Sequence, residues 1–295
     1  MRILAVAISL VLTGCTLVNR VGVTLLYRKA DLPATQIAHD LCYLPTSPCD
    51  GPDHKLDLYL PITKPWPVIV FVHGGGWDSG DKDFRAGGAD VYANIGRYYA
   101  TRGIGVAVIN YRLQRRAKWP QQVEDVQTAV SWVRSHALEY GGQPDRLFLM
   151  GHSAGTHLAS MVALTATPEV RQAIRGVIAV SGAGLDLADE KTYQLGADRD
   201  YYAARFRDGD SGDDWKRRAS PVRFVNPQAP PFLILYAQGE TRALQHQSQL
   251  LHAELERNGV ASRLVPVPGE SHTRIVLALS QPDKVPVKAI LEFVH

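Results

Sequence analysis

A pentapeptide in the middle of the chain, Gly151-His152-Ser153-Ala154-Gly155, has the residue types and spacing of a nucleophilic serine motif. An apolar run, LFLM, precedes it, and a helix-like run, THLASMVAL, follows it. A strand that turns sharply into a helix would strain the serine backbone, expose its hydroxyl and leave room only for glycine on either side. The start of the helix would also direct backbone N–H groups toward a reacting oxygen. The other interpretation is a glycine-rich turn that carries an inert serine.

A second glycine-rich segment, HGGGW at residues 73–77, directly follows the apolar run VIVFV. Glycines let the backbone approach a ligand closely, and preorganised N–H donors stabilise a tetrahedral oxyanion by ~3 kcal/mol each. We expect the N–H groups of Gly75, Gly76 and Ala154 to form such an oxyanion hole; a flexible loop before a helix is the other interpretation. Trp77 is expected either to wall the pocket or to pack the loop. The motif residues expected to border the substrate are His73, Gly74, Trp77 and His152.

A serine hydroxyl needs a general base, and the base needs an acid to orient it and balance its charge. His272, in the segment GESH after the last predicted strand, is the predicted base. Glu240 is the predicted acid because it is the only carboxylate in the loop AQGE after the apolar run FLILY, although it could be a solvated loop residue. Asp186, in GLDL after an earlier apolar run, is the second candidate. Glu270 is too close in sequence to His272 to be its partner.

The elements that must position these residues are short buried strands that alternate with helices. Apolar or alternating runs predict strands at 55–59, 68–72, 105–110, 147–150, 177–180, 232–236 and 263–267. Helical spacing of apolar residues predicts helices at 91–101, 121–140, 157–164, 245–258 and 287–294. This alternation predicts an α/β fold whose mostly parallel sheet is covered by helices on both faces. The polar, aromatic-containing stretch 182–230 is too long for a simple loop and predicts a small lid.

The amino-terminal segment has the pattern of an export signal. Arg2 precedes the apolar run 3–12, which as a helix would span ~15 Å against a bilayer core of ~30 Å. The tetrad LTGC, which ends at Cys15, resembles a bacterial lipobox, and this implies cleavage before Cys15 and lipid on its thiol. A plain signal peptide or a buried first helix is the other interpretation. We expect an exported lipoprotein, anchored on the periplasmic side of a membrane.

Cys42 and Cys49 flank the segment YLPTSP, whose prolines and serine suit a turn. An exported protein meets an oxidising compartment, so we expect a disulfide between them, with two free thiols as the alternative. Their spacing does not match a zinc site, and no histidine pair lies nearby at ligand spacing. The chain also lacks nucleotide and dinucleotide fingerprints. The sequence therefore predicts no metal, nucleotide or redox cofactor.

Composition and charge exclude several classes of protein. The chain has 295 residues, of which 45% are apolar and 21% charged, which is typical of a folded globular protein and excludes a disordered or collagen-like chain. Its 32 basic and 29 acidic residues give a net charge of +3, too balanced to suggest a nucleic-acid partner.

Together these motifs resemble the α/β-hydrolase superfamily, and more narrowly its small esterase branch of feruloyl-type and acetyl esterases, hormone-sensitive-lipase-like enzymes and arylformamidases. The order Ser–acid–His, the elbow GHSAG and the loop HGGGW carry the resemblance, with further similarity in KLDLYLP, NYRL and ASPVRFV. The resemblance implies an α/β-hydrolase fold and a triad of Ser153, Glu240 and His272, although many relatives have aspartate at the position of Glu240. The expected organisation is a signal peptide at 1–14, an arm at 15–52 and a hydrolase domain at 53–295 with its lid at about 182–230.

The implied reaction is hydrolysis of a small-molecule carboxylic ester by Ser153 through an acyl-enzyme. A short lid favours short-acyl or aryl esters. Three other functions remain open: arylformamidase-type amide hydrolysis by the same chemistry, an inactive binding module on the same scaffold, and a peptidase.

Overall fold

The computed structural model describes residues 27–45, 48–49, 51–207, 209 and 212–295. Cys15 and the predicted signal peptide at 1–14 lie outside the described residues. None of the helices in this described part has the length and the apolar character needed to cross a bilayer.

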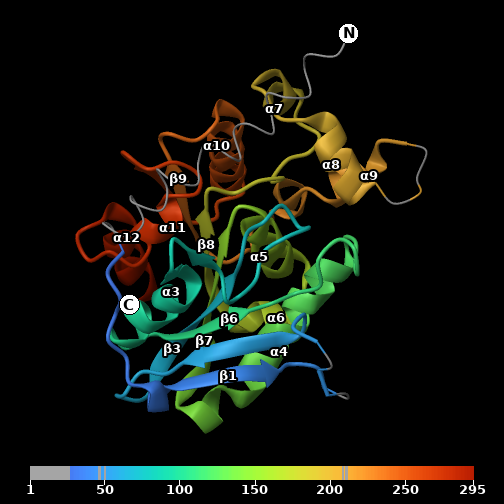
Figure 1. Ribbon diagram of the computed structural model, residues 1–295. Coiled ribbons are helices and arrows are strands. Elements are labelled where there is room, and N and C mark those ends of the chain that lie inside the picture. Colours follow the sequence, from blue (N-terminus) through green and yellow to red (C-terminus); the bar gives the residue numbers. More distant parts are fainter. Residues whose placement is uncertain (1–26, 46–47, 50, 208, 210–211) are drawn as a thin grey trace.

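One eight-stranded sheet forms the centre of the molecule (Figure 1), in the strand order β1-β2-β6-β3-β7-β8-β9-β10. The strands are β1 Ile37–Cys42, β2 Lys55–Tyr59, β3 Trp66–Val72, β6 Gly105–Ile109, β7 Gly142–His152, β8 Ile174–Val180, β9 Phe232–Ala237 and β10 Ser262–Val267. The neighbours from β6 to β10 are parallel, whereas β2 is antiparallel to both β1 and β6. The predicted, mostly parallel sheet is therefore confirmed.

Helices cover both faces of the sheet, as predicted. One face packs against α4 Gln121–Tyr140, α5 Ala154–Thr165, α6 Pro168–Ala173 and α10 Arg242–Arg257. The other face packs against α3 Val91–Ala100, α11 Ile275–Ala278 and α12 Val285–Val294. Helix α10 begins earlier than predicted because the Thr241 side chain accepts a hydrogen bond from the Leu244 N–H and caps its first turn.

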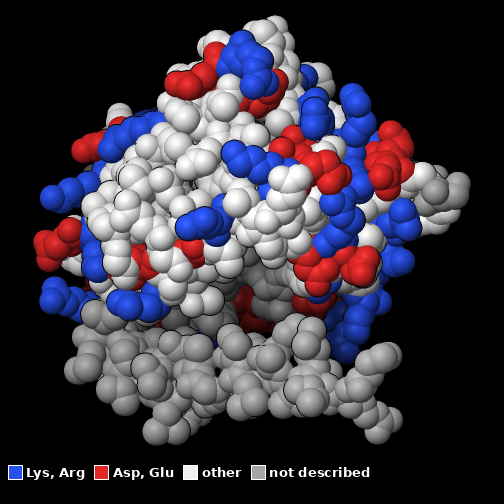
Figure 2. Space-filling model, turned by 90° about the horizontal axis from the view of Figure 1, so that it is seen from above, with Lys and Arg blue, Asp and Glu red and all other residues white. Residues whose placement is uncertain are grey.

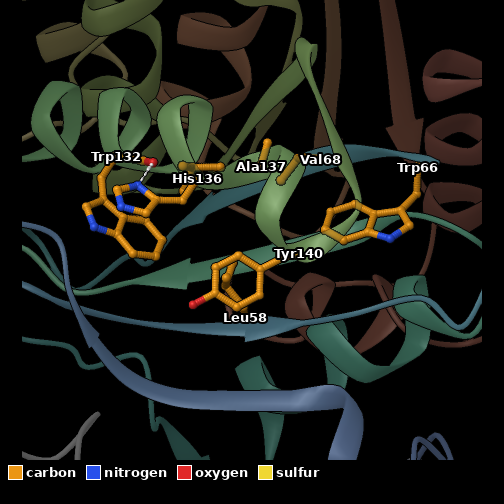
Figure 3. A pocket seen from close by; sticks show the side chains of 8 residues that line it. Leu58, Trp66, Val68, Trp132, His136, Ala137 and Tyr140 are labelled. Carbon is orange, nitrogen blue, oxygen red and sulfur yellow. Dashed lines mark hydrogen bonds between the residues drawn. The ribbon is translucent and has the colours of Figure 1, made fainter. Parts of the chain in front are cut away.

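Packing between α4 and the sheet is close (Figure 3). Trp132, His136 and Tyr140 face Leu58 and Trp66 around an apolar pocket of about 10 Å³. The His136 ring stacks on Trp132 with ring centroids 4.1 Å apart, and its Nδ1–H donates to the Trp132 carbonyl at 2.8 Å. The pocket has room for about one water molecule and lies between α4 and the sheet.

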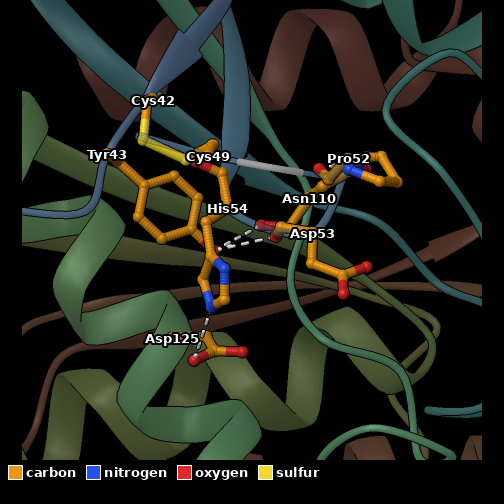
Figure 4. The surroundings of a disulfide bond; sticks show 8 residues. All are labelled: Cys42, Tyr43, Cys49, Pro52, Asp53, His54, Asn110 and Asp125. Atoms are coloured by element: carbon orange, nitrogen blue, oxygen red, sulfur yellow. Dashed lines mark hydrogen bonds and ion pairs between the residues drawn. A yellow bond between two sulfur atoms is a disulfide. The ribbon is translucent and has the colours of Figure 1, made fainter. Parts of the chain in front are cut away.

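The segment predicted as a connecting arm contains strand β1, which pairs with β2 at one edge of the sheet. Cys42 at the end of β1 is joined to Cys49 by a disulfide bond (Figure 4). The neighbouring Tyr43 is buried, and its hydroxyl donates to the Asn110 carbonyl at 2.8 Å. The disulfide and this buried tyrosine attach the turn after β1 to the body of the sheet.

The stretch interpreted as a lid follows β8 and contains α7 Glu190–Gln194, α8 Arg199–Phe206, α9 Asp214–Arg218 and the 3-10 turn η2 Pro221–Phe224. Asp189 and Asp198 cap α7 and α8, each by accepting a backbone N–H in the first turn. Buried Tyr202, Phe206 and Trp215 attach these helices to the core. In Figure 1 the three helices form one group at the upper right, with α11 and α12 on the opposite side of the molecule.

Charges on the molecule are mixed. Seen from above, basic and acidic side chains alternate over the described part of the visible face (Figure 2). The described part of that face therefore carries no continuous cationic surface.

Candidate active site

Ser153 lies in a sharp turn between β7, which ends at His152, and α5, which begins at Ala154. Its φ of 55° and ψ of −118° are values that residues with a side chain rarely adopt. The turn is possible only between glycines: a Cβ on Gly151 would lie 2.3 Å from the Gly155 carbonyl carbon, and one on Gly155 would lie 2.1 Å from the Val72 oxygen. This is the strained strand-to-helix turn that the pentapeptide predicts.

Three side chains from distant parts of the chain form one hydrogen-bonded line. The Ser153 hydroxyl donates to Nε2 of His272 at 2.9 Å, and Nδ1–H of His272 donates to Oε2 of Glu240 at 3.0 Å. His272 is partly exposed, at 28% of its side chain, whereas the Glu240 side chain is fully buried. The fold brings all three predicted residues together from the ends of β7, β9 and β10.

Asp186, the second candidate for the acid, lies elsewhere. Its carboxylate forms an ion pair with Arg223 at 3.0 Å and accepts a hydrogen bond from the Ala188 N–H at 3.0 Å. Both Asp186 and Glu240 follow a parallel strand, so the sequence left the choice open. The structure has Glu240 against the imidazole, with its second oxygen, Oε1, buried and unpartnered among the described residues.

The HGGGW loop follows β3 and lies beside the serine. Gly75 and Gly76 have φ of 117° and 62°, in the left-handed region that favours glycine. The Gly75 carbonyl accepts hydrogen bonds from the Ser79 N–H at 3.0 Å and from its hydroxyl at 2.7 Å. Because a trans peptide directs its N–H opposite its carbonyl, these bonds set the direction of the Gly76 N–H. The third predicted donor, Ala154, is the first residue of α5.

A pocket of about 630 Å³ opens beside Ser153 and His272. Its walls are mainly apolar, and the side chains that form them are Phe84, Ala86, Val91, Tyr92, Val276 and Leu277. Among its described lining residues, Arg274 is the one with a formal charge. No described residue of the lid belongs to this lining. Sequence reasoning missed the short hairpin of β4 Arg85–Ala86 and β5 Ala89–Asp90, for which the adjacent Gly87 and Gly88 were the available signal.

Two of the four residues expected to border the substrate, Gly74 and His152, line the pocket, and the other two do not. His73 is buried and stacks on Tyr111 at 4.4 Å, and burial lowers its pKa to about 4. Trp77 is buried and meets the ring of Phe206 from the lid edge-on at 4.8 Å. Of the two roles expected for Trp77, packing the loop is the one observed. Neither Trp77 nor His73 is among the residues that line this pocket.

His152, the residue before the serine, contacts the imidazole at 272. Its Nε2–H donates to the His272 carbonyl oxygen at 2.8 Å, and the two ring centroids are 5.0 Å apart. Burial, assisted by the neighbouring His272, lowers the pKa of His152 to about 3. His152 is therefore neutral at ordinary pH and serves as a hydrogen-bond donor to the backbone.

The chain is similar in sequence to proteins that are named as esterases. The chain is 30% identical over 256 residues to a probable isoprenylcysteine alpha-carbonyl methylesterase of Arabidopsis thaliana, covering 77% of this chain and 50% of that protein. It is 28% identical to the esterase LipQ of Mycobacterium tuberculosis, covering 82% of this chain and 59% of that protein. The chain thus spans about half the length of the curated relatives that it matches.

Solved structures share the fold. Esterase B from Lactobacillus rhamnosis superposes with a TM-score of 0.73 at 22% identity, covering 97% of this chain and 90% of that one. An esterase of Pyrobaculum calidifontis superposes with a TM-score of 0.72 at 19% identity, covering 96% of this chain and 91% of that one. The family model described as BD-FAE matches residues 56–255, which contain the serine turn, the glycine loop and Glu240. With this match over more than half of its length, the chain belongs to the BD-FAE family and has the α/β-hydrolase fold.

Proposed function

We propose that this protein is a serine hydrolase of carboxylic esters. The observation that carries the proposal is the hydrogen-bonded line from the Ser153 hydroxyl through His272 to Glu240, next to a glycine loop and an open pocket. The esterase names of its relatives support the same reaction.

In the proposed mechanism, Oγ of Ser153 attacks the ester carbonyl carbon while Nε2 of His272 accepts the hydroxyl proton. The carbonyl oxygen becomes an oxyanion and accepts hydrogen bonds from the N–H groups of Gly75, Gly76 and Ala154. When the bond to the alcohol oxygen breaks, His272 returns the proton to that oxygen and the alcohol leaves. Water then attacks the acyl-enzyme, with His272 again as base, which releases the acid and restores Ser153.

Glu240 acts on His272 in both steps. Its carboxylate keeps the proton of neutral His272 on Nδ1, which leaves Nε2 free to accept from the serine, and it balances the charge of the imidazolium. Its complete burial strengthens this interaction because water does not screen it.

We propose esters with a short acyl or aryl group as substrates. The mainly apolar walls of the pocket and its volume of about 630 Å³ support a compact hydrophobic group. Faster cleavage of long acyl chains than of acetate or butyrate would contradict this proposal.

The test of the hydrolase assignment is turnover of p-nitrophenyl acetate by the wild type and by Ser153→Ala. Loss of the nucleophile is expected to lower kcat by about 10⁴-fold or more. Equal rates would reject the assignment and favour a binding module. An aryl formamide assayed in parallel separates the amide-cleaving alternative, which predicts that the formamide is the faster substrate.

We also propose export and lipid anchoring through Cys15, supported by the segment MRILAVAISLVLTGC and by a disulfide of the kind that persists in oxidising compartments. Expressed in a bacterium, wild type and Ser153→Ala are expected to incorporate labelled palmitate and fractionate with membranes. Cys15→Ser is expected to do neither. Equal labelling and membrane association of Cys15→Ser would contradict the anchor.

A further inference from the structure

The lid contacts the glycine loop through one side chain of α8. Nε–H of Arg205 donates to the Gly76 carbonyl oxygen at 2.7 Å, and the same guanidinium forms an ion pair with Asp78 just beyond the loop. Nη1 also donates to the Tyr201 carbonyl at 3.1 Å. The Arg205 side chain is only 13% exposed. These contacts fix the guanidinium and join the lid to the loop that contains the predicted oxyanion donors.

Tyr201, one helical turn before Arg205, contacts the same glycine. The guanidinium carbon of Arg205 lies 3.5 Å from the centroid of the Tyr201 ring. The tyrosine hydroxyl covers Gly76 so closely that a Cβ there would lie 2.2 Å from it. Two side chains of α8 therefore restrain Gly76 from outside the pocket.

The Gly76 N–H lies in the peptide plane of the Gly75 carbonyl, and the torsions at the Gly76 Cα set that plane relative to the next one. Ser79 holds the plane on one side by two hydrogen bonds to the Gly75 carbonyl. Arg205 holds the plane on the other side by its bond to the Gly76 carbonyl. Since glycine has no side chain to restrict φ and ψ, these bonds are needed to keep the donor in one direction.

We propose that Arg205 is a positioning residue, through which the lid holds the glycine loop in the conformation that stabilises the oxyanion. The inference rests on the proposed function. It gives the lid a role other than covering the substrate, in agreement with the absence of its described residues from the pocket lining. The charge of Arg205 is paired with Asp78, so its effect comes from the geometry of its hydrogen bonds.

Arg205→Ala is the test, and Arg199→Ala is a matched control on the same helix. Arg199 also stacks on a tyrosine, Tyr193, at 4.0 Å and pairs with a carboxylate, that of Glu190 at 2.6 Å. Both of these partners belong to the lid. We expect Arg205→Ala to lower kcat by about 10- to 100-fold with KM within about twofold, because a preorganised donor acts mainly in the transition state. Arg199→Ala should keep the wild-type kcat.

A matched inhibitor pair separates positioning from general damage to the fold. An aryl trifluoromethyl ketone adds to Ser153 and forms a charged tetrahedral oxygen, whereas the corresponding methyl ketone binds largely without adding. Arg205→Ala should weaken binding of the fluorinated ketone by the same factor by which it lowers kcat, and it should leave binding of the methyl ketone unchanged. Arg205→Lys keeps the charge but lacks the planar fork, so it should recover only part of the loss.

Melting temperatures of all variants are measured alongside, and if Arg205→Ala does not fold, Arg205→Lys is judged by the same two readouts. The inference is overturned if the folded Arg205 variant keeps kcat within twofold of Arg199→Ala. It is also overturned if the variant binds both ketones more weakly by the same factor. A wild-type protein that neither cleaves esters nor binds the fluorinated ketone would instead reject the proposed function itself, and the inference with it.

Discussion

His152 donates a hydrogen bond from Nε2–H to the backbone carbonyl oxygen of His272, at 2.8 Å. The residue before the proposed nucleophile thus holds the backbone of the proposed base. The pKa of His152 is about 3, chiefly because the ring is buried, so no second positive charge stands beside His272 when its imidazole is protonated. The pair connects the ends of β7 and β10, which carry the two reacting groups.

Replacing His152 by phenylalanine is expected to lower kcat by roughly 5- to 10-fold, the equivalent of one hydrogen bond of about 1 kcal/mol. The ring volume is kept, so the loss should reflect the position of His272. The check is kcat together with the pH profile of kcat/KM. Because His152 is neutral well below pH 6, the acid limb should have the same midpoint in the variant. A shift in the midpoint of the acid limb would assign that ionisation to His152 and would contradict its role as a neutral hydrogen-bond donor.

Glu240 should tolerate neither shortening nor neutralisation. Glu240→Asp retracts the carboxylate by one methylene from a partner now at 3.0 Å, and we expect kcat to fall by about 10- to 100-fold. Glu240→Gln keeps the length but loses the charge that stabilises the imidazolium. We expect it to lower kcat by up to about 10⁴-fold. Steady-state kinetics on one aryl acetate check both.

The control for these substitutions is Asp186→Asn. Asp186 pairs with Arg223, so this change should reduce the melting temperature and leave kcat near that of the wild type. A kcat loss in Asp186→Asn as large as that in Glu240→Gln would contradict the role of Glu240.

Arg274 should favour esters whose alcohol portion carries a carboxylate. It follows His272, the proposed proton donor to the leaving oxygen, by two residues and lines the pocket. Arg274 and Lys284 share one carboxylate, that of Glu270, at 3.7 and 2.7 Å, which leaves a net positive charge near the pocket. Guanidinium groups bind carboxylates through paired hydrogen bonds.

The measurement compares 4-acetoxybenzoate with its neutral methyl ester. We expect the ratio of their kcat/KM values to fall by about 3- to 10-fold in Arg274→Gln, the range of a partly exposed ion pair. The rate on the neutral ester should be unchanged. Equal ratios in the two proteins would exclude a role for Arg274 in selecting substrate.

Local patterns predicted the parts of this molecule that depend on local geometry. The turn around Ser153 is one, because only glycines fit beside it, and the buried strand runs are another. Glu240 is the predicted partner of His272, but Asp186 also follows a parallel strand, and only the positions of β8 and β9 in the sheet distinguish the two. Strand β1 was missed because its half-buried residues lack an apolar run. The pocket walls were predicted only in part: Val91 and Tyr92 lie on the predicted helix at 91–101, whereas Ala86 lies in a hairpin of two-residue strands and Val276 and Leu277 in the four-residue α11.

Buried histidines other than the proposed base His272 should make the free energy of unfolding depend on pH in acid. The pKa of His73 and that of His157 are both lowered to about 4, in each case mainly by burial. In the unfolded chain these groups titrate near pH 6.5, so between about pH 6.5 and 4 the unfolded state binds protons that the folded state does not. Stability is therefore complete above this range. It falls as pH decreases through it, by about 1.4 kcal/mol per pH unit for each such histidine.

His157 offers the cleanest test, because its hydrogen bond and ring contacts involve Ala219, Trp77 and Phe206 and not the three proposed catalytic side chains. Its Nε2–H donates to the Ala219 carbonyl at 2.7 Å, and its ring packs against Trp77 and Phe206. A glutamine can keep the donor while removing the titrating group. We expect the slope of unfolding free energy against pH to be shallower in His157→Gln between pH 4.5 and 6 by about 1.4 kcal/mol per unit. Above pH 7 the curves should run parallel, and parallel curves in acid as well would mean that His157 is protonated in the folded protein.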